Sequence, residues 1–125
     1  MRTASIEIGG REHLLCFSAR VVRACTERYG GMENIDDALS ADDPVKALDE
    51  AVWLLAAMMD GGARYAKLNE IPTAPALTAD ELLDVLDIGD FAKMREKIAE
   101  TITNGKETHV EADPPKNAET TPAAP

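Results

Sequence analysis

The chain has 125 residues, of which 45% are hydrophobic but only 4% aromatic, and its formal net charge is −10. This length suits one small domain with a mostly aliphatic core, and the acidity disfavours direct nucleic-acid binding, which needs a basic surface. The N-terminus lacks the apolar run of a signal peptide, and the longest apolar run, residues 51–59, is too short to span a membrane. We therefore expect a cytoplasmic protein with reduced cysteines.

The first segment, residues 5–18, has the pattern of a β-hairpin. Ile6 and Ile8 alternate with polar residues, a Gly-Gly pair provides a two-residue turn, and a second alternating run follows. With a tight turn, Ile6 lies opposite His13 and Ile8 lies opposite Arg11. One face of the hairpin is then apolar apart from His13, and it needs helices to cover it, because an isolated hairpin is marginally stable in water.

Two helical segments are predicted directly after the hairpin. Ser18 is a good N-cap for a helix over residues 19–29, and Gly30-Gly31 provides a C-cap signal. A shorter helix is expected within residues 32–39, where apolar residues recur at helical spacing.

The clearest helix signal covers residues 44–60. Asp43 can cap this helix, Pro44 suits its first position, and the glycine pair that follows predicts its end, with a separate helix resuming beyond. The apolar residues of its expected inner stripe are Val45, Leu48, Val52, Leu55 and Met59. The remaining faces are apolar as well, which is typical of a helix that is either central in the fold or part of a contact surface.

Two further helices are predicted near the end of the folded region. Thr78 and Glu81 form a capping box, and Leu77 and Leu82 form a hydrophobic staple, so a helix starts here. The last helix is expected over residues 91–103, because apolar residues share one of its faces and an Asn-Gly pair follows.

These elements predict an α+β fold in which an N-terminal β-hairpin packs on a mainly helical bundle of four to five helices. Residues 1–105 form the single expected domain. Residues 106–125 are rich in Pro, Thr, Ala and charged residues, with Val110 as the only large apolar side chain. Such a segment buries too little apolar surface to order itself, so we expect a disordered polar tail.

The reactive side chains concentrate near the hairpin, at His13, Cys16 and Cys25. On a strand, His13 and Cys16 point to opposite faces, so they cannot share a metal ion or form a Cys–His catalytic pair. The two cysteines lack the C-x-x-C spacing of zinc and redox sites. We expect all three residues to serve packing, and we predict no catalytic residue, no metal site and no cofactor.

The order of these segments resembles the small tail assembly chaperones of long-tailed bacteriophages, of the type found in siphophages and prophages. The matching segments are "IEIGGREHLLCFS" followed by "ARVVRACTERYGGMENIDDAL", then "LDEAVWLLAAMMDGGARY", then "LTADELLDVLDIGDF" and "KIAETITNG", ahead of a polar tail. The likeness covers about residues 5–105 and is one of pattern and order, without a catalytic string.

The resemblance implies a non-enzymatic assembly factor in the host cytoplasm that is absent from the mature virion. Such chaperones bind the long helical tape measure protein, keep it soluble, and help the tail tube protein to polymerise around it. Self-association is a further expectation, because one helix is apolar nearly all round. From the surplus apolar side chains alone, the predicted contact residues are Trp53, Leu54, Met58, Tyr65 and Leu68.

The family also makes a longer product by programmed ribosomal frameshifting near the end of the short frame. Pro115, Lys116 and Asn117 can be encoded CCA-AAA-AAC, and Pro114, Pro115 and Lys116 can be encoded CCC-CCA-AAA. Both contain a slippery heptamer, so this stretch is a candidate frameshift site that the gene sequence can test.

A second class of function is compatible with the acidic composition. A small regulatory or adaptor protein of a mobile element, such as a DNA mimic or an antitoxin-like protein, would also be short and acidic. A mimic needs carboxylates along one continuous surface, whereas here they alternate with apolar residues of helices.

Overall fold

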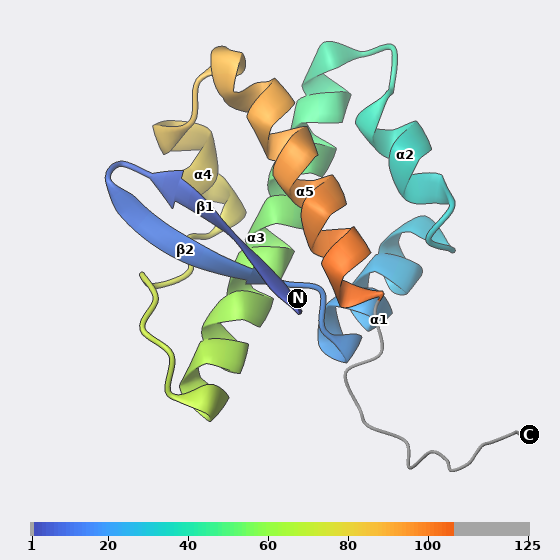
Figure 1. Ribbon diagram of the computed structural model, residues 1–125. Coiled ribbons are helices and arrows are strands. Elements are labelled where there is room, and N and C mark those ends of the chain that lie inside the picture. The colour runs from blue at the N-terminus through green and yellow to red at the C-terminus, as the bar shows by residue number, and fades with distance from the viewer. Residues whose placement is uncertain (1, 107–125) are drawn as a thin grey trace, which may run out of the picture.

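The computed structural model describes residues 2–106 (Figure 1). The elements in chain order are β1 (Thr3–Ile8), β2 (Arg11–Cys16), α1 (Ala19–Tyr29), α2 (Asn34–Leu39), α3 (Pro44–Asn69), α4 (Ala79–Val85), the 3-10 helix η1 (Ile88–Asp90) and α5 (Phe91–Gly105). The predicted α+β class is confirmed, since a two-stranded antiparallel hairpin packs on five α-helices in this part of the chain. The candidate frameshift residues and nearly all of the predicted tail lie outside the described residues.

The hairpin has the predicted register. Ile6 pairs with His13 and Ile8 with Arg11, and the face shared by Ile6, His13 and Leu15 is buried. The outer edge of β2 is covered by the segment that follows α3. There the Leu14 N–H donates to Thr73 Oγ1 at 2.8 Å, and the Ala74 N–H donates to the Glu12 carbonyl oxygen at 3.1 Å. This cover leaves little of the β2 edge open for pairing with another strand.

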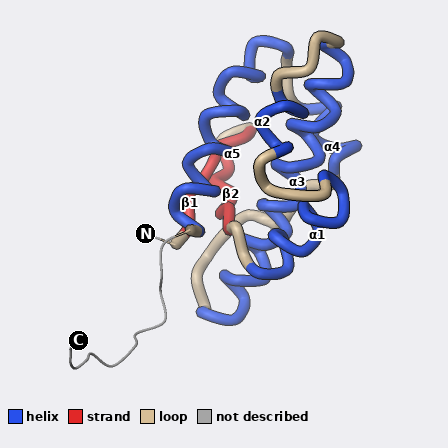
Figure 2. The backbone as a smooth tube through the Cα atoms, turned by 90° about the vertical axis from the view of Figure 1, so that its right-hand side faces the viewer, coloured by secondary structure: helices blue, strands red, loops and turns tan. Residues whose placement is uncertain are grey.

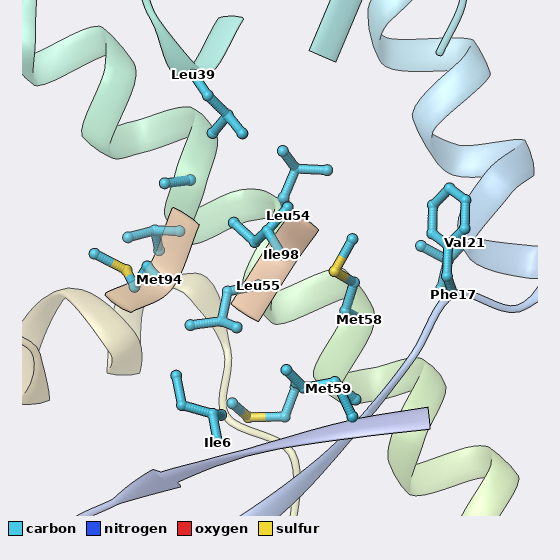
Figure 3. Packing of buried hydrophobic residues seen from close by; sticks show 14 of the residues in the cluster. Ile6, Phe17, Val21, Leu39, Leu54, Leu55, Met58, Met59, Met94 and Ile98 are labelled. Atoms are coloured by element: carbon cyan, nitrogen blue, oxygen red, sulfur yellow. The ribbon is translucent and has the colours of Figure 1, made fainter. Parts of the chain in front are cut away.

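Helix α3 is the central element of the fold. It contacts β2 and all four other α-helices, and Figures 1 and 2 show it enclosed by the hairpin and the remaining helices. Its middle supplies the fully buried Leu54, Leu55 and Met58, together with Met59, which is 1% exposed. Figure 3 shows these side chains between Ile6 of the hairpin and the other helices. The core is therefore aliphatic and rich in methionine, as the low aromatic content predicts.

The predicted end of α3 is wrong. The glycine pair Gly61-Gly62 lies inside the helix, which continues to Asn69 as one segment of 26 residues. Both glycines are buried against β2, where a Cβ at Gly61 would lie 2.8 Å from the Cys16 carbonyl oxygen and one at Gly62 would overlap the Leu14 carbonyl. The glycines therefore permit close packing of the helix on the strand instead of ending the helix.

Val45 is also placed differently from the prediction. It was expected in the inner stripe of α3, but 66% of it is exposed. Ala47 in the same turn is buried, so the turn packs on the core through Ala47 and leaves Val45 on its open side.

The predicted boundaries of α1 and the predicted start of α4 are confirmed. Ser18 accepts the Val21 N–H at the start of α1, and Gly30 ends that helix with a φ of 82°. The capping box of α4 is complete, since the Thr78 hydroxyl accepts the Glu81 N–H at 3.1 Å and the Glu81 carboxylate accepts the Thr78 N–H at 2.8 Å. The side chains of these caps satisfy amide groups that the helix itself leaves unpaired.

Candidate partner-binding surface

The three reactive side chains of the hairpin region are buried. His13 is 2% exposed, Cys16 is 2% exposed, and Cys25 is fully buried. Both cysteines are free thiols, and burial raises the pKa of each above its ordinary value. A thiol with a raised pKa is a poor nucleophile, because the thiolate is the reactive form.

The imidazole of His13 is held in an apolar setting. Burial, with a smaller effect of the Arg11 charge, lowers the pKa of His13 below its ordinary value of 6.5, while a hydrogen bond to the Pro75 backbone opposes this shift. Its Nδ1 atom has no hydrogen-bond partner among the described residues. Across residues 2–106, no group of three or more His, Cys, Asp or Glu side chains is arranged to hold a metal ion.

The predicted contact residue Trp53 belongs to a side-chain cluster that joins α1 to α3. The Arg28 guanidinium lies 4.5 Å from the centre of the Trp53 ring, and the Tyr29 ring meets Trp53 edge to face at 5.8 Å. The Glu50 carboxylate forms an ion pair with Arg28 Nε at 2.9 Å, and its Oε1 accepts a hydrogen bond from the Tyr29 hydroxyl at an O–O distance of 2.7 Å. Trp53 therefore already has partners within the chain.

The electrostatics of this cluster favour a charged Glu50. Burial alone would raise the pKa of Glu50, but the hydrogen bonds from Arg28 and Tyr29 outweigh it, so the pKa lies below its ordinary value. The pKa of Tyr29 is raised, chiefly by burial and then by its hydrogen bond to Glu50. The phenol therefore stays protonated and donates to the carboxylate.

The other predicted contact residues do not form one surface. Leu54 and Met58 are completely buried in the core, so the expectation that they contribute to a contact surface is wrong. Tyr65 is half-buried, with the Arg2 guanidinium 5.7 Å from its ring centre. Leu68 is 84% exposed, but it is about 22 Å along α3 from Trp53, at 1.5 Å per residue.

A different apolar surface runs along α5. It consists of two adjoining hollows, which both have Leu39 and Arg95 in their walls. The first, of about 360 Å³, lies between α2 and α5, and the second, of about 560 Å³, lies between the beginnings of α3 and α5. Figure 1 shows α2 and the first turns of α3 next to α5. We call the two hollows together the α5 groove.

The larger hollow of the α5 groove is lined mainly by apolar surface. Val45 at the start of α3 is 66% exposed, and Ile88 of η1 is 86% exposed. Both border the larger hollow, whose walls also include the partly buried Leu48 and Phe91. Exposed apolar side chains that gather around a hollow indicate a binding surface more strongly than isolated ones do.

The charged residues of the α5 groove are mostly acidic. Asp36, Asp42 and Glu96 contribute carboxylates to its walls, and Arg95 is the one cation among the lining residues. The Arg95 guanidinium lies 5.8 Å from the centre of the Phe91 ring. The groove thus combines an apolar floor with a net negative wall.

The sequence reasoning missed this groove. Val45 is predicted in the inner stripe of α3, and none of the predicted contact residues lines the groove. A sequence signal that could have indicated it is Ile88, an apolar residue between Asp87 and Gly89.

Comparison with protein-family models, with curated proteins and with solved structures finds no match for this chain. Between residues 2 and 106, no helix has both the length and the apolarity needed to cross a membrane. A function must therefore be argued from the groove, the charge of the chain and the resemblance in its sequence.

Proposed function

We propose that this chain is a tail assembly chaperone of a long-tailed phage or prophage. It binds the tape measure protein, keeps it soluble, and promotes assembly of the tail tube protein around it, without catalysing a reaction. The observation that carries the proposal is the α5 groove, an open apolar hollow between helices on a strongly acidic chain.

The shape of the groove supports a helical client. Grooves between helices receive amphipathic helices, whose apolar side chains at i, i+3, i+4 and i+7 fill the hollow. The tape measure proteins of the resembled family are long and helical, and they expose apolar surface before the tube encloses them. Val45 and Ile88 provide apolar contacts for such a helix at the mouth of the groove.

The charge of the chain supports a solubilising role. With 23 acidic and 13 basic residues, the protein gives a complex with an apolar client a net charge far from zero, which opposes aggregation. The buried state of His13, Cys16 and Cys25 is also more compatible with a binding protein than with an enzyme.

The proposal is tested by co-expression with the tape measure gene of the same locus. We expect the tape measure protein to be largely insoluble alone and soluble with this chain, and to co-purify with it. The double variant Val45→Gln, Ile88→Gln should lose the effect. Leu68→Gln, at an exposed residue of the contact surface predicted from the sequence, should keep it, because Leu68 lies outside the α5 groove.

Two outcomes would count against the proposal. One is a tape measure protein whose solubility does not depend on this chain. The other is a gene neighbourhood without tail genes, because chaperones of this type are encoded between the tube and tape measure genes. The same gene sequence tests the frameshift site at residues 114–117, which requires a slippery heptamer and an overlapping downstream frame.

A further inference from the structure

We propose that the α5 groove recognises an amphipathic helix of about three turns whose apolar stripe is flanked by lysine and arginine side chains. The identification of the natural client rests on the proposed function, but the groove and its chemistry do not.

The length of the groove matches a short helix. Its lining residues on α5 extend from Phe91 to Ile102, which is about 17 Å at a rise of 1.5 Å per residue, or three helical turns. Ala92 and Ala99 lie one above the other on this face of α5. Because their side chains are small, the axis of a second helix can approach α5 closely there.

The apolar surface of the groove is concentrated at one end. Val45 and Ile88, from two different elements, both line the larger hollow and are exposed. An apolar side chain bound in this hollow would shield both from water, and the burial of apolar surface stabilises the complex. The tightest contacts of the partner should therefore be made at this end.

The charges select the flanks of the partner helix. The carboxylates of Asp36 and Asp42 and of Glu96 border the groove, against the single guanidinium of Arg95. Positive side chains beside the apolar stripe of a partner complement this wall, while acidic ones repel it. Such charge complementarity contributes to the rate of association and to the choice of partner.

Two other occupants fit the groove less well. A second copy of the chain has a net charge of −10 and the same acidic wall, so contact between two such grooves is repulsive. The chain's own segment 107–125 has Val110 as its only large apolar residue. Its charged side chains are mostly acidic, namely Glu107, Glu111, Asp113 and Glu119 against Lys116.

The test uses the full chain and three fluorescent synthetic peptides of about 18 residues, compared by anisotropy. The first has an apolar stripe at helical spacing with Lys and Arg flanks. The second carries Glu in place of each basic residue, and the third has the composition of the first in scrambled order. We expect the first peptide to bind at least tenfold more tightly than either of the others, with affinity falling as salt is added.

Matched variants locate the binding to the groove. Val45→Gln with Ile88→Gln should weaken binding of the basic peptide about tenfold. Asp36→Asn with Asp42→Asn should weaken it about threefold and reduce its salt dependence. The controls Leu68→Gln and Glu70→Gln make comparable changes at the other end of α3, about 34 Å along the helix from Val45, and should leave the affinity within twofold. Circular dichroism and thermal melts confirm that each variant is folded.

Several results would overturn the inference. These are equal binding of the acidic peptide, an affinity unchanged by the groove variants, and a loss of affinity in the far-end controls. A groove-dependent dimer in sedimentation would instead identify a second copy as the occupant, and displacement of the basic peptide by a peptide of residues 107–125 would identify that segment.

The two proposals fail separately. If the basic peptide binds the groove but the tape measure protein is not solubilised, the proposed function fails and the groove chemistry stands. If the tape measure protein is solubilised equally by the Val45→Gln, Ile88→Gln variant, the assignment of the groove fails and the chaperone function stands.

Discussion

At the scale of single residues, His13 is the most unusual buried group. It lies opposite Ile6 on the inner face of the hairpin, and its Nδ1 atom has no partner among the described residues. A neutral imidazole can remain there, whereas a protonated one would bring an uncompensated charge into the core.

This burial predicts a pH-dependent stability. Because the folded pKa of His13 lies below 6.5, the unfolded chain binds more protons as the pH falls through this value. The free energy of unfolding therefore decreases below about pH 6.5 and continues to fall until the folded pKa is reached. Urea unfolding at about pH 7.5 and about pH 5.5 should show this decrease, and His13→Leu should remove most of it. If the free energy of unfolding of His13→Leu decreased with pH as much as that of the wild type, this role of His13 would be contradicted.

Leu54 separates a core residue from a surface residue. Leu54→Ala should lower the free energy of unfolding by about 2–5 kcal/mol, because it creates a cavity in the centre of the fold. Leu68→Ala, at a side chain that is 84% exposed, should change it by less than about 0.5 kcal/mol. Chemical denaturation of both variants measures the difference. Similar decreases in the free energy of unfolding would contradict the burial of Leu54 in the core.

At the level of secondary structure, α3 packs closely on β2. Gly61 and Gly62 place the helix backbone directly against the carbonyl groups of Cys16 and Leu14. This contact lets one long helix pack on the hairpin along part of its length.

Gly62→Ala tests this contact. Alanine favours a helix over glycine by about 1 kcal/mol, but here its Cβ would overlap the Leu14 carbonyl, so we expect a net loss of about 2–3 kcal/mol. Gly89→Ala is the control, because nothing lies within 4 Å of a Cβ at Gly89. Thermal unfolding should show a lower midpoint for Gly62→Ala alone. An unchanged or raised midpoint would mean that the helix and the strand can separate without cost.

The attachment of α1 to α3 depends on Glu50. Glu50→Gln removes the charge that holds Arg28 and accepts from Tyr29, with the Glu50 side chain only 15% exposed. We expect a loss of about 1 kcal/mol. Glu27→Gln breaks an exposed pair with Arg23 at 3.8 Å and should cost less than about 0.5 kcal/mol. Equal losses in denaturant titrations would remove the case for a specific cluster.

At the scale of the whole molecule, local signals predicted the fold well. The hairpin register follows from the alternation of Ile6 and Ile8 and from a two-residue turn, and the caps Ser18 and Thr78 marked their helices correctly. The helix end predicted at Gly61-Gly62 is wrong for a physical reason. A glycine pair that ends a helix and one that lets a helix pack against a strand look the same in sequence.

The binding surface was not predictable in the same way. The α5 groove is formed by α2, α3 and α5, which are distant along the chain, so no local pattern describes it. The apolar surplus of α3 was visible, but only the tertiary structure shows that Leu54 and Met58 fill the core while Val45 remains exposed.

Hydrogen exchange, measured on the chain alone and in complex with the tape measure protein of its own locus, locates the surface that binds the client. Binding should slow amide exchange at the walls of the α5 groove, in residues 35–48 and 88–102, because bound segments open less often. Residues 63–73, at the far end of α3, should exchange at the same rate in both states. Protection confined to residues 63–73, or no protection along α5, would contradict the claim that this chain binds its client through the α5 groove.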